Sequence, residues 1–209
     1  MLFKFEKPFD NSVHYTLNKD GYRCPEWEDI DWTNSHVLFG CSVVQGVGLE
    51  DWDTLDNQLS RIFNEPVVNL GQCGGSLSLI LANTYKLIDA GVRPKSIILV
   101  HPEPSRVALF LNDTVFHIGV SWTQPKELDR WYKRWIADGN AEYYGYLASR
   151  SIESAWGNIG IKITSVYQPN LPGLGKLPRY VDFAKDNAHP GPKTIGLWAR
   201  HIAKKKSQS

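Results

Sequence analysis

Three short apolar runs, rich in β-branched residues, constrain the fold of this chain most strongly. They lie at 37–39, 66–70 and 96–100, and segments with helically spaced apolar residues separate them, at 53–63 and 77–90. Glycines follow two of the three runs, as Gly40 and Gly71. Strands that alternate with helices in this order are typical of a parallel sheet that helices cover on both faces. The pattern therefore predicts an α/β fold.

The second half of the chain continues with a mixture of elements. The expected elements are a hairpin from 107–111 and 115–118, a helix opened by Pro125, a helix capped by Asn140 that runs to about 156, a strand at 160–167, a long loop at 168–180 and a last helix from 193 to about 204. The first 35 residues show little periodicity, apart from a strand expected at 15–23 that leads into an Asp-Gly turn. A chain of 209 residues is long enough for one domain with a sizeable core.

Ser42 lies where parallel α/β sheets place their ligands. It follows the first predicted strand, and Gly40 between them permits a backbone bend that a Cβ would resist. A helix is expected directly after the serine. A hydroxyl in such a turn can act as a nucleophile if a base reaches it. Ser42 is therefore the candidate nucleophile.

A candidate base lies near the other end of the chain. Asp186 and His189 are three residues apart in the loop-like segment Asp-Asn-Ala-His-Pro-Gly. A carboxylate that orients an imidazole, which in turn deprotonates a serine, is the arrangement of a catalytic triad. We therefore expect His189 to act as general base, and then general acid, and Asp186 to hold its tautomer.

These two segments together resemble the SGNH (GDSL-type) hydrolases, a family of esterases and lipases. The resemblance lies in Phe-Gly-x-Ser-x-x-x-Gly at 39–46 and Asp-x-x-His-Pro at 186–190, and it spans most of the chain from about residue 37. It implies a three-layer α/β/α sandwich with a central parallel, flavodoxin-like sheet. Residues 36–209 would form this SGNH hydrolase-like domain, and 1–35 an N-terminal extension packed on it. Cys41 stands where the family usually has an aspartate before the serine.

The resemblance also implies donors for the oxyanion that forms during acyl transfer. The Ser42 amide is one donor, because the turn before a helix points N–H groups outward. The family's Asn-x-x-x-x-Gly block matches Asn69 and Gly74, which makes the Gly74 amide the second donor. Gly71 is the alternative if the register is different.

A third donor of the family is absent from this sequence. The family has an asparagine in a Gly-x-Asn-Asp block after the third strand, but residues 101–106 read His-Pro-Glu-Pro-Ser-Arg. Glu103 or Ser105 stands in that region, and Arg106 or a bound water are further candidates for the role. Whether residues 102–122 form a lid over the site is left open.

Composition limits the classes of binding partner, the cofactors and the cellular compartment that we expect for this protein. The net charge is +1, so no nucleic-acid or membrane partner is expected. Three cysteines do not make a disulfide framework, and none has the spacing of a zinc site. No metal or other cofactor is expected. The N-terminus lacks an apolar signal region, which favours a cytoplasmic protein. The chain also resembles viral and environmental proteins with a Gly-Cys-Ser block, and this resemblance leaves a virion-associated setting open.

The first hypothesis on function is a serine esterase. It would cleave an acyl or acetyl ester, on a carbohydrate or a small molecule, with Ser42, His189 and Asp186 as the triad. The eight Trp and nine Tyr suit carbohydrate contact. The alternative is an inactive module of the same fold that binds glycan or has a structural role. A flavin or nucleotide site is disfavoured, because neither glycine cluster makes a Gly-x-Gly-x-x-Gly motif.

Overall fold

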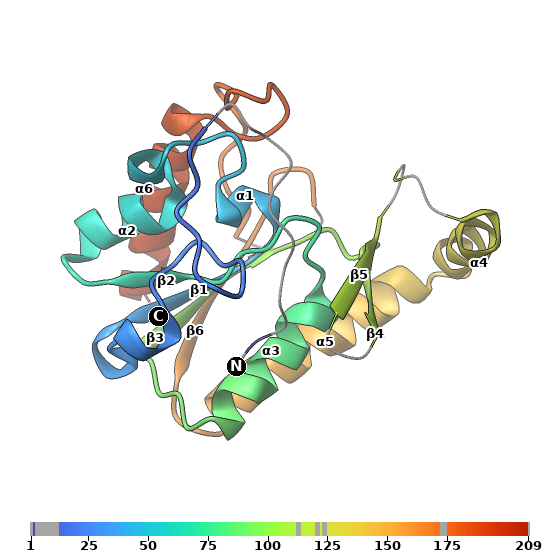
Figure 1. Cartoon of the computed structure of the whole chain (residues 1–209), viewed down its shortest axis with the longest axis horizontal. Helices are drawn as coiled ribbons and strands as arrows, with labels where there is room; N and C mark the ends of the chain where they lie inside the picture. The colour runs from blue at the N-terminus through green and yellow to red at the C-terminus, as the bar shows by residue number, and fades with distance from the viewer. Residues whose placement is uncertain are drawn as a thin grey trace.

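A four-stranded parallel sheet forms the centre of the computed structural model, which describes residues 2, 13–111, 114–119, 122, 125–171 and 175–208 (Figure 1). The strands are β1 (His36–Phe39), β2 (Val67–Asn69), β3 (Ser96–His101) and β6 (Lys162–Tyr167), in the order β2-β1-β3-β6. Every neighbouring pair runs parallel. The predicted α/β fold with a parallel sheet is confirmed.

Helices cover both faces of this sheet and make the expected three layers. The α-helices are α1 (Ser42–Gln45), α2 (Leu55–Phe63), α3 (Leu77–Asp89), α4 (Lys126–Ala137), α5 (Asn140–Gly157) and α6 (Pro192–Gln208), and short 3₁₀ turns occupy Trp27–Asp29, Trp32–Asn34 and Asp51–Asp53. Helices α2 and α6 lie together on one face, and α3 and α5 lie together on the other (Figure 1).

The strand side chains explain this layering. Alternate residues of a strand point to opposite faces, and here both faces are buried. Leu38 and Ile98 pack with α2 and α6, whereas Val37 and Phe39 pack with α3 and α5. All four side chains are fully buried. Continuous apolar strands are therefore what this sheet requires.

The topology fixes the place of the site. From β1 the chain continues into the α2 face, whereas from β3 it continues through α5 on the opposite face. Neighbouring parallel strands whose connections diverge in this way leave a crevice outside their carboxyl ends. Ser42, the first residue of α1, lies at that end of β1.

An antiparallel hairpin and α4 extend away from the sheet (Figure 1). The hairpin pairs β4 (Val107–Leu111) with β5 (Thr114–Ile118), as the sequence predicted. Its expected turn at Asn112 and Asp113 lies outside the described residues. Among the residues that are described, no helix is both long and apolar enough to cross a membrane.

Three local predictions are corrected by the structure. Residues 15–23 form no strand, although the expected turn is present, with Gly21 donating to the Asn18 carbonyl at 3.0 Å. Asn140 is the first residue of α5 rather than its cap, a position that Gly139 occupies with a left-handed φ of +75°. Helix α6 runs four residues beyond the predicted end because Lys205 anchors its last turns, donating to the Ser165 carbonyl at 2.5 Å.

The described part of the first 35 residues contributes to the main core. Tyr22 and Trp27 are buried among the side chains of α3 and α5. Asn18 organises the turn before them, because its Oδ1 accepts hydrogen bonds from two backbone amides. The division of the chain into an extension and a domain at residue 35 stays a prediction.

Candidate active site

Ser42, His189 and Asp186 form one chain of hydrogen bonds. Ser42 Oγ lies 2.8 Å from His189 Nε2, and His189 Nδ1 bonds to Asp186 Oδ2. The serine follows β1, whereas the histidine and aspartate come from the loop before α6, 147 residues further along the chain. The structure thus brings together the three residues that the sequence singled out.

The environment of Asp186 suits a carboxylate that orients an imidazole. Burial opposes its ionised form, but hydrogen bonds from the His189 ring and from the amides of His189 and Ala188 hold the pKa of Asp186 below its ordinary value. Those two amides donate to Oδ1 at 3.1 Å each. An ionised Asp186 accepts the proton of His189 Nδ1, and this leaves the Nε2 lone pair facing Ser42.

Gly48 forms the surface against which the aspartate packs. Its φ of +75° is left-handed, and a Cβ there would lie 3.1 Å from Asp186 Cγ and 3.0 Å from Ala184 Cβ. The Gly48 carbonyl accepts from the Lys185 amide at 3.1 Å, and its amide donates to the Tyr15 hydroxyl at 2.8 Å. Only glycine satisfies both the backbone angle and the close approach.

Arg23 fixes the loop that follows the nucleophile, and the sequence analysis missed it. Its guanidinium donates to the carbonyls of Gly46 at 2.7 Å and Leu49 at 2.8 Å. It also forms two hydrogen bonds with Asp51 Oδ1, at 2.8 and 2.6 Å. The Arg23 side chain is 4% exposed, so little water competes for these donors. A single arginine in an irregular segment carries no sequence pattern that announces this role.

Asn69 organises the start of the glycine-rich loop after β2. Its Oδ1 accepts from the Gly71 amide at 2.9 Å, and its Nδ2 donates to Asp56 Oδ1 at 2.6 Å. The Gly71 amide is therefore already used within the loop. This leaves Gly74 as the better of the two glycines for an oxyanion donor.

Gly74 lies beside the turn that carries Ser42. A Cβ on the next residue, Gly75, would lie 3.1 Å from the Gly40 carbonyl oxygen and 3.5 Å from Cys41 Cα. Within the described chain, the Ser42 amide donates to no other residue. The Gly74 amide faces the sulfur of Cys73, a weak acceptor that a ligand oxygen can replace.

Gln45 ties the glycine-rich loop to the helix of the nucleophile. Its Oε1 accepts from the Cys73 amide at 2.8 Å, and the side chain is fully buried. Gln45 lies three residues after Ser42 on α1, so one short helix positions both the hydroxyl and the loop that contains Gly74. This is a second positioning residue that the sequence analysis did not identify.

The segment after β3 presents polar groups toward the interior. Ser105 Oγ and Arg106 Nη1 are buried and lack a hydrogen-bond partner among the described residues. Cys41 is buried, and Gln168 Nε2 lies 3.5 Å from its sulfur and donates to the His101 carbonyl at 3.0 Å. The segment after β3 therefore brings buried polar side chains to this region, but none of them is an asparagine.

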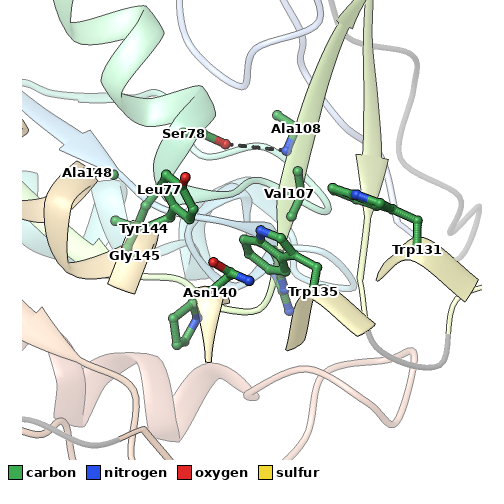
Figure 2. Close-up of a pocket in the computed structure, with 12 residues that line it drawn as sticks. Leu77, Ser78, Val107, Ala108, Trp131, Trp135, Asn140, Tyr144, Gly145 and Ala148 are labelled. Atoms are coloured by element: carbon green, nitrogen blue, oxygen red, sulfur yellow. Dashed lines mark hydrogen bonds between the residues drawn. The ribbon is translucent and has the colours of Figure 1, made fainter. Parts of the chain in front are cut away.

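A cavity of about 410 Å³ lies next to this segment, between α3, β4, α4 and α5 (Figure 2). Trp131, Trp135 and Tyr144 line it, and their rings stack in series with centroid separations of 6.1 and 6.3 Å. Ser78 at the start of α3 accepts from the Ala108 amide at 3.4 Å and joins the helix to the hairpin. Arg106 also lines this cavity.

Metal and disulfide chemistry find little support in the described ranges. They contain no group of three or more His, Cys, Asp or Glu side chains that could hold a metal ion. Cys24, Cys41 and Cys73 are all free thiols.

Comparison by sequence finds no relative: no protein-family model and no curated protein matches the chain. Comparison by structure finds a psychrotrophic esterase, EstA from Pseudoalteromonas sp., which is 10% identical with a TM-score of 0.52. The match covers 84% of this chain and 98% of the esterase. At this identity the likeness is one of fold.

Two further structures match with lower TM-scores. A carbohydrate esterase family 2 enzyme from Myceliophthora fergusii is 11% identical over 90% of this chain and 70% of its own, with a TM-score of 0.49. A protein of the G-D-S-L family from Desulfitobacterium hafniense is 14% identical over 83% of this chain and 99% of its own, with a TM-score of 0.40. In its fold, the chain resembles the SGNH (GDSL-type) hydrolases.

Proposed function

We propose that this protein is a serine esterase that uses Ser42, His189 and Asp186 as a catalytic triad. The observation that carries the proposal is the continuous set of hydrogen bonds from Ser42 Oγ through His189 to Asp186. Its place at the topological switch point of a parallel sheet supports the proposal, because ligands of such sheets bind there. The fold that the chain shares with known esterases is consistent with it.

The reaction proceeds in two halves. Ser42 Oγ attacks the ester carbonyl carbon while His189 Nε2 takes the hydroxyl proton, and the carbonyl electron pair moves onto oxygen to give an oxyanion. The amides of Ser42 and Gly74 donate to that oxygen. The intermediate then collapses, the bond to the alcohol breaks, and His189 returns the proton to the leaving alcohol. Water repeats the sequence on the acyl-enzyme and releases the acid.

The substrate class that we favour is a short acyl ester, such as an acetyl group, on a carbohydrate or other small molecule. The cavity that Arg106 lines supports this choice, since stacked Trp131, Trp135 and Tyr144 offer flat apolar faces to a sugar ring. Trp131 is 46% exposed and Tyr144 55% exposed, so both rings are accessible.

Ester turnover by the wild type and by Ser42→Ala tests the proposal. We expect p-nitrophenyl acetate and acetylated xylose to be hydrolysed by the wild type, and the kcat/KM of Ser42→Ala to fall at least ~10⁴-fold. A fluorophosphonate probe should label Ser42, as mapped by mass spectrometry, because labelling requires an activated hydroxyl. Ser154→Ala, at an exposed position on α5, is the matched control and should keep full activity.

Equal turnover in the wild type and Ser42→Ala would refute the esterase proposal. The second candidate, a glycan-binding module without catalysis, is favoured by one observation, an aromatic cavity whose lining contains none of Ser42, His189 and Asp186. It predicts oligosaccharide binding that Trp131→Ala abolishes and Ser42→Ala leaves intact, with no turnover on any ester of the panel. Titration calorimetry on both variants separates the two proposals.

A further inference from the structure

Arg106 carries a positive charge that the described protein does not neutralise. Its Nη1 is buried and has no hydrogen-bond partner among the described residues. Elsewhere on the guanidinium, the Cys41 side chain forms a hydrogen bond, and Glu103 acts on the charge of Arg106 without a direct contact in the described residues. A buried guanidinium with an unused donor is costly unless something binds it. The arrangement points to an anionic ligand or transition state as the missing partner.

The position of Arg106 points to the oxyanion. The Trp122 ring lies near both Arg106 and Gly74. The guanidinium carbon of Arg106 lies 5.6 Å from the ring centroid, and a Cβ built on Gly74 would lie 3.1 Å from the edge of the same ring. The Gly74 amide is the second proposed donor. Arg106 also follows β3, the strand after which the SGNH family places its third donor.

The charge of Arg106 is felt at the residue next to the nucleophile. Burial opposes the charged form, but the Cys41 sulfur, Glu103 and Cys73 together raise the pKa of Arg106 above its ordinary value. Cys41 immediately precedes Ser42. The guanidinium is therefore a permanent cation close to the turn where an oxyanion would form.

Ser105 and Glu103 are weaker candidates for the same role. Ser105 Oγ is buried without a hydrogen-bond partner among the described residues, but it is a neutral donor and would stabilise an oxyanion less than a cation. Its carbonyl accepts from the Tyr132 hydroxyl at 2.7 Å, which turns the residue toward α4. Glu103 would repel a developing negative charge.

We propose that Arg106 is the third oxyanion donor of this site, in place of the asparagine of the SGNH family. The inference rests on the proposed esterase function and adds a charged donor to it. As Ser42 Oγ bonds to the carbonyl carbon and the electron pair moves onto oxygen, Arg106 Nη1 donates to that oxygen beside the Ser42 and Gly74 amides. When the leaving group departs, the carbonyl reforms and the donor is released.

Kinetics of Arg106 variants on a neutral ester test this inference. We expect Arg106→Gln to lower kcat for p-nitrophenyl acetate by about 10²–10³-fold with little change in KM, because the donor acts on the transition state. Arg106→Lys should recover part of the loss. In Arg106→Ala, millimolar guanidinium chloride should restore activity, an effect that a purely structural role would not produce.

Two control variants and an active-site titration make the result interpretable. Ser105→Ala changes the neighbouring residue, and Arg200→Gln removes a surface arginine on α6. Both should keep the wild-type kcat. Burst titration with the ester gives the fraction of competent enzyme, so each kcat refers to folded sites only.

The possible outcomes separate this inference from the proposed function. If Ser42→Ala abolishes turnover and Arg106→Gln keeps the wild-type kcat, the esterase stands and the inference falls. The inference also falls if Arg106→Gln only raises KM for anionic esters, since the arginine then binds a ground-state charge. A large loss in Ser105→Ala with none in Arg106→Gln would assign the role to the serine.

Discussion

The two sides of Ser42 are built on opposite principles. On the side of the base, hydrogen bonds within the protein use the functional groups of Asp186, His189, Arg23 and Gly48. On the side where we propose that the carbonyl oxygen binds, the Ser42 amide and Arg106 Nη1 have no partner among the described residues, and the Gly74 amide faces only the Cys73 sulfur.

This difference separates the parts that must be rigid from the parts that must bind. A base has to meet the nucleophile in one geometry before substrate arrives, so its supports are satisfied internally. Oxyanion donors are useful only if they have no partner in the free enzyme, because the transition state provides it. The hydrogen bonds of Asp186 and His189 meet the first requirement, and the free Ser42 amide and Arg106 Nη1 meet the second.

Removal of the Asp186 carboxylate is expected to cause the largest loss of activity among the variants on the side of the base. Asp186→Asn keeps the shape but offers an amide to His189, which permits the wrong tautomer. We expect kcat to fall on the order of 10³–10⁴-fold. Turnover of p-nitrophenyl acetate is the measurement, and Asp182→Asn, at a nearby position that caps α6, is the comparison. A loss in Asp186→Asn no greater than that in Asp182→Asn would argue against the triad.

Gly48→Ala tests whether the base side tolerates displacement. The added methyl must move Asp186 or Ala184, and the left-handed φ adds strain. We expect a loss of about 10–10²-fold in kcat, since small misplacements of positioned groups carry large penalties. Gly91→Ala is the control, because its φ of +77° is also left-handed but nothing lies within 4 Å of the new Cβ. Equal kcat in both variants would show that the packing against Asp186 does not matter.

Gln45→Met tests the link between the two sides. Methionine fills similar space but cannot accept the hydrogen bond of the Cys73 amide, so the loop with Gly74 loses its anchor on α1. We expect a moderate loss, about 10-fold in kcat, with KM less affected. The rate of fluorophosphonate labelling should fall in parallel, because that reaction also develops charge on oxygen. An unchanged labelling rate would contradict a role in positioning the donors.

Asp56 offers the smallest effect, one on stability rather than on turnover. Burial raises the pKa of Asp56 to about 6, above its ordinary value near 3.8. A carboxyl with a raised pKa favours the folded state at low pH, and this contribution is lost as the pH rises from about 4 through 6. The free energy of unfolding of the wild type should therefore fall relative to Asp56→Asn by on the order of 2 kcal/mol between pH 4 and 7. Urea titrations at both pH values measure it, and a difference of the opposite sign would refute the assignment.

The sequence was sufficient to predict the framework and to single out Ser42, His189 and Asp186, which the structure joins by hydrogen bonds, and there is a physical reason for both. Buried parallel strands must be apolar on both faces, and a serine or a histidine in a glycine- or proline-bounded loop stands out from such a background. The supports were not visible in the same way. Arg23 and Gln45 act through contacts with backbone groups that are close only after folding, and no local pattern marks such partners.

The strand predicted at 15–23 failed for a related reason. A strand was expected there to lead into the Asp-Gly turn, but the side chains of this segment contact other parts of the protein instead. Tyr15 accepts from Gly48, and Tyr22 enters the core beside α3. Contacts of this kind replace the ladder of backbone hydrogen bonds that a strand would need.

The contacts of Arg23 bear on where this protein can be shortened. A chain that began at Ser35 would keep every strand of the central sheet and all three residues of the triad. It would lose Arg23, which donates hydrogen bonds to the carbonyls of the loop after Ser42, and Tyr15, which accepts the hydrogen bond of the Gly48 amide. It would also leave a gap in the core where Tyr22 and Trp27 pack, so the described part of this segment belongs with the sheet both in its packing and in its support of Ser42.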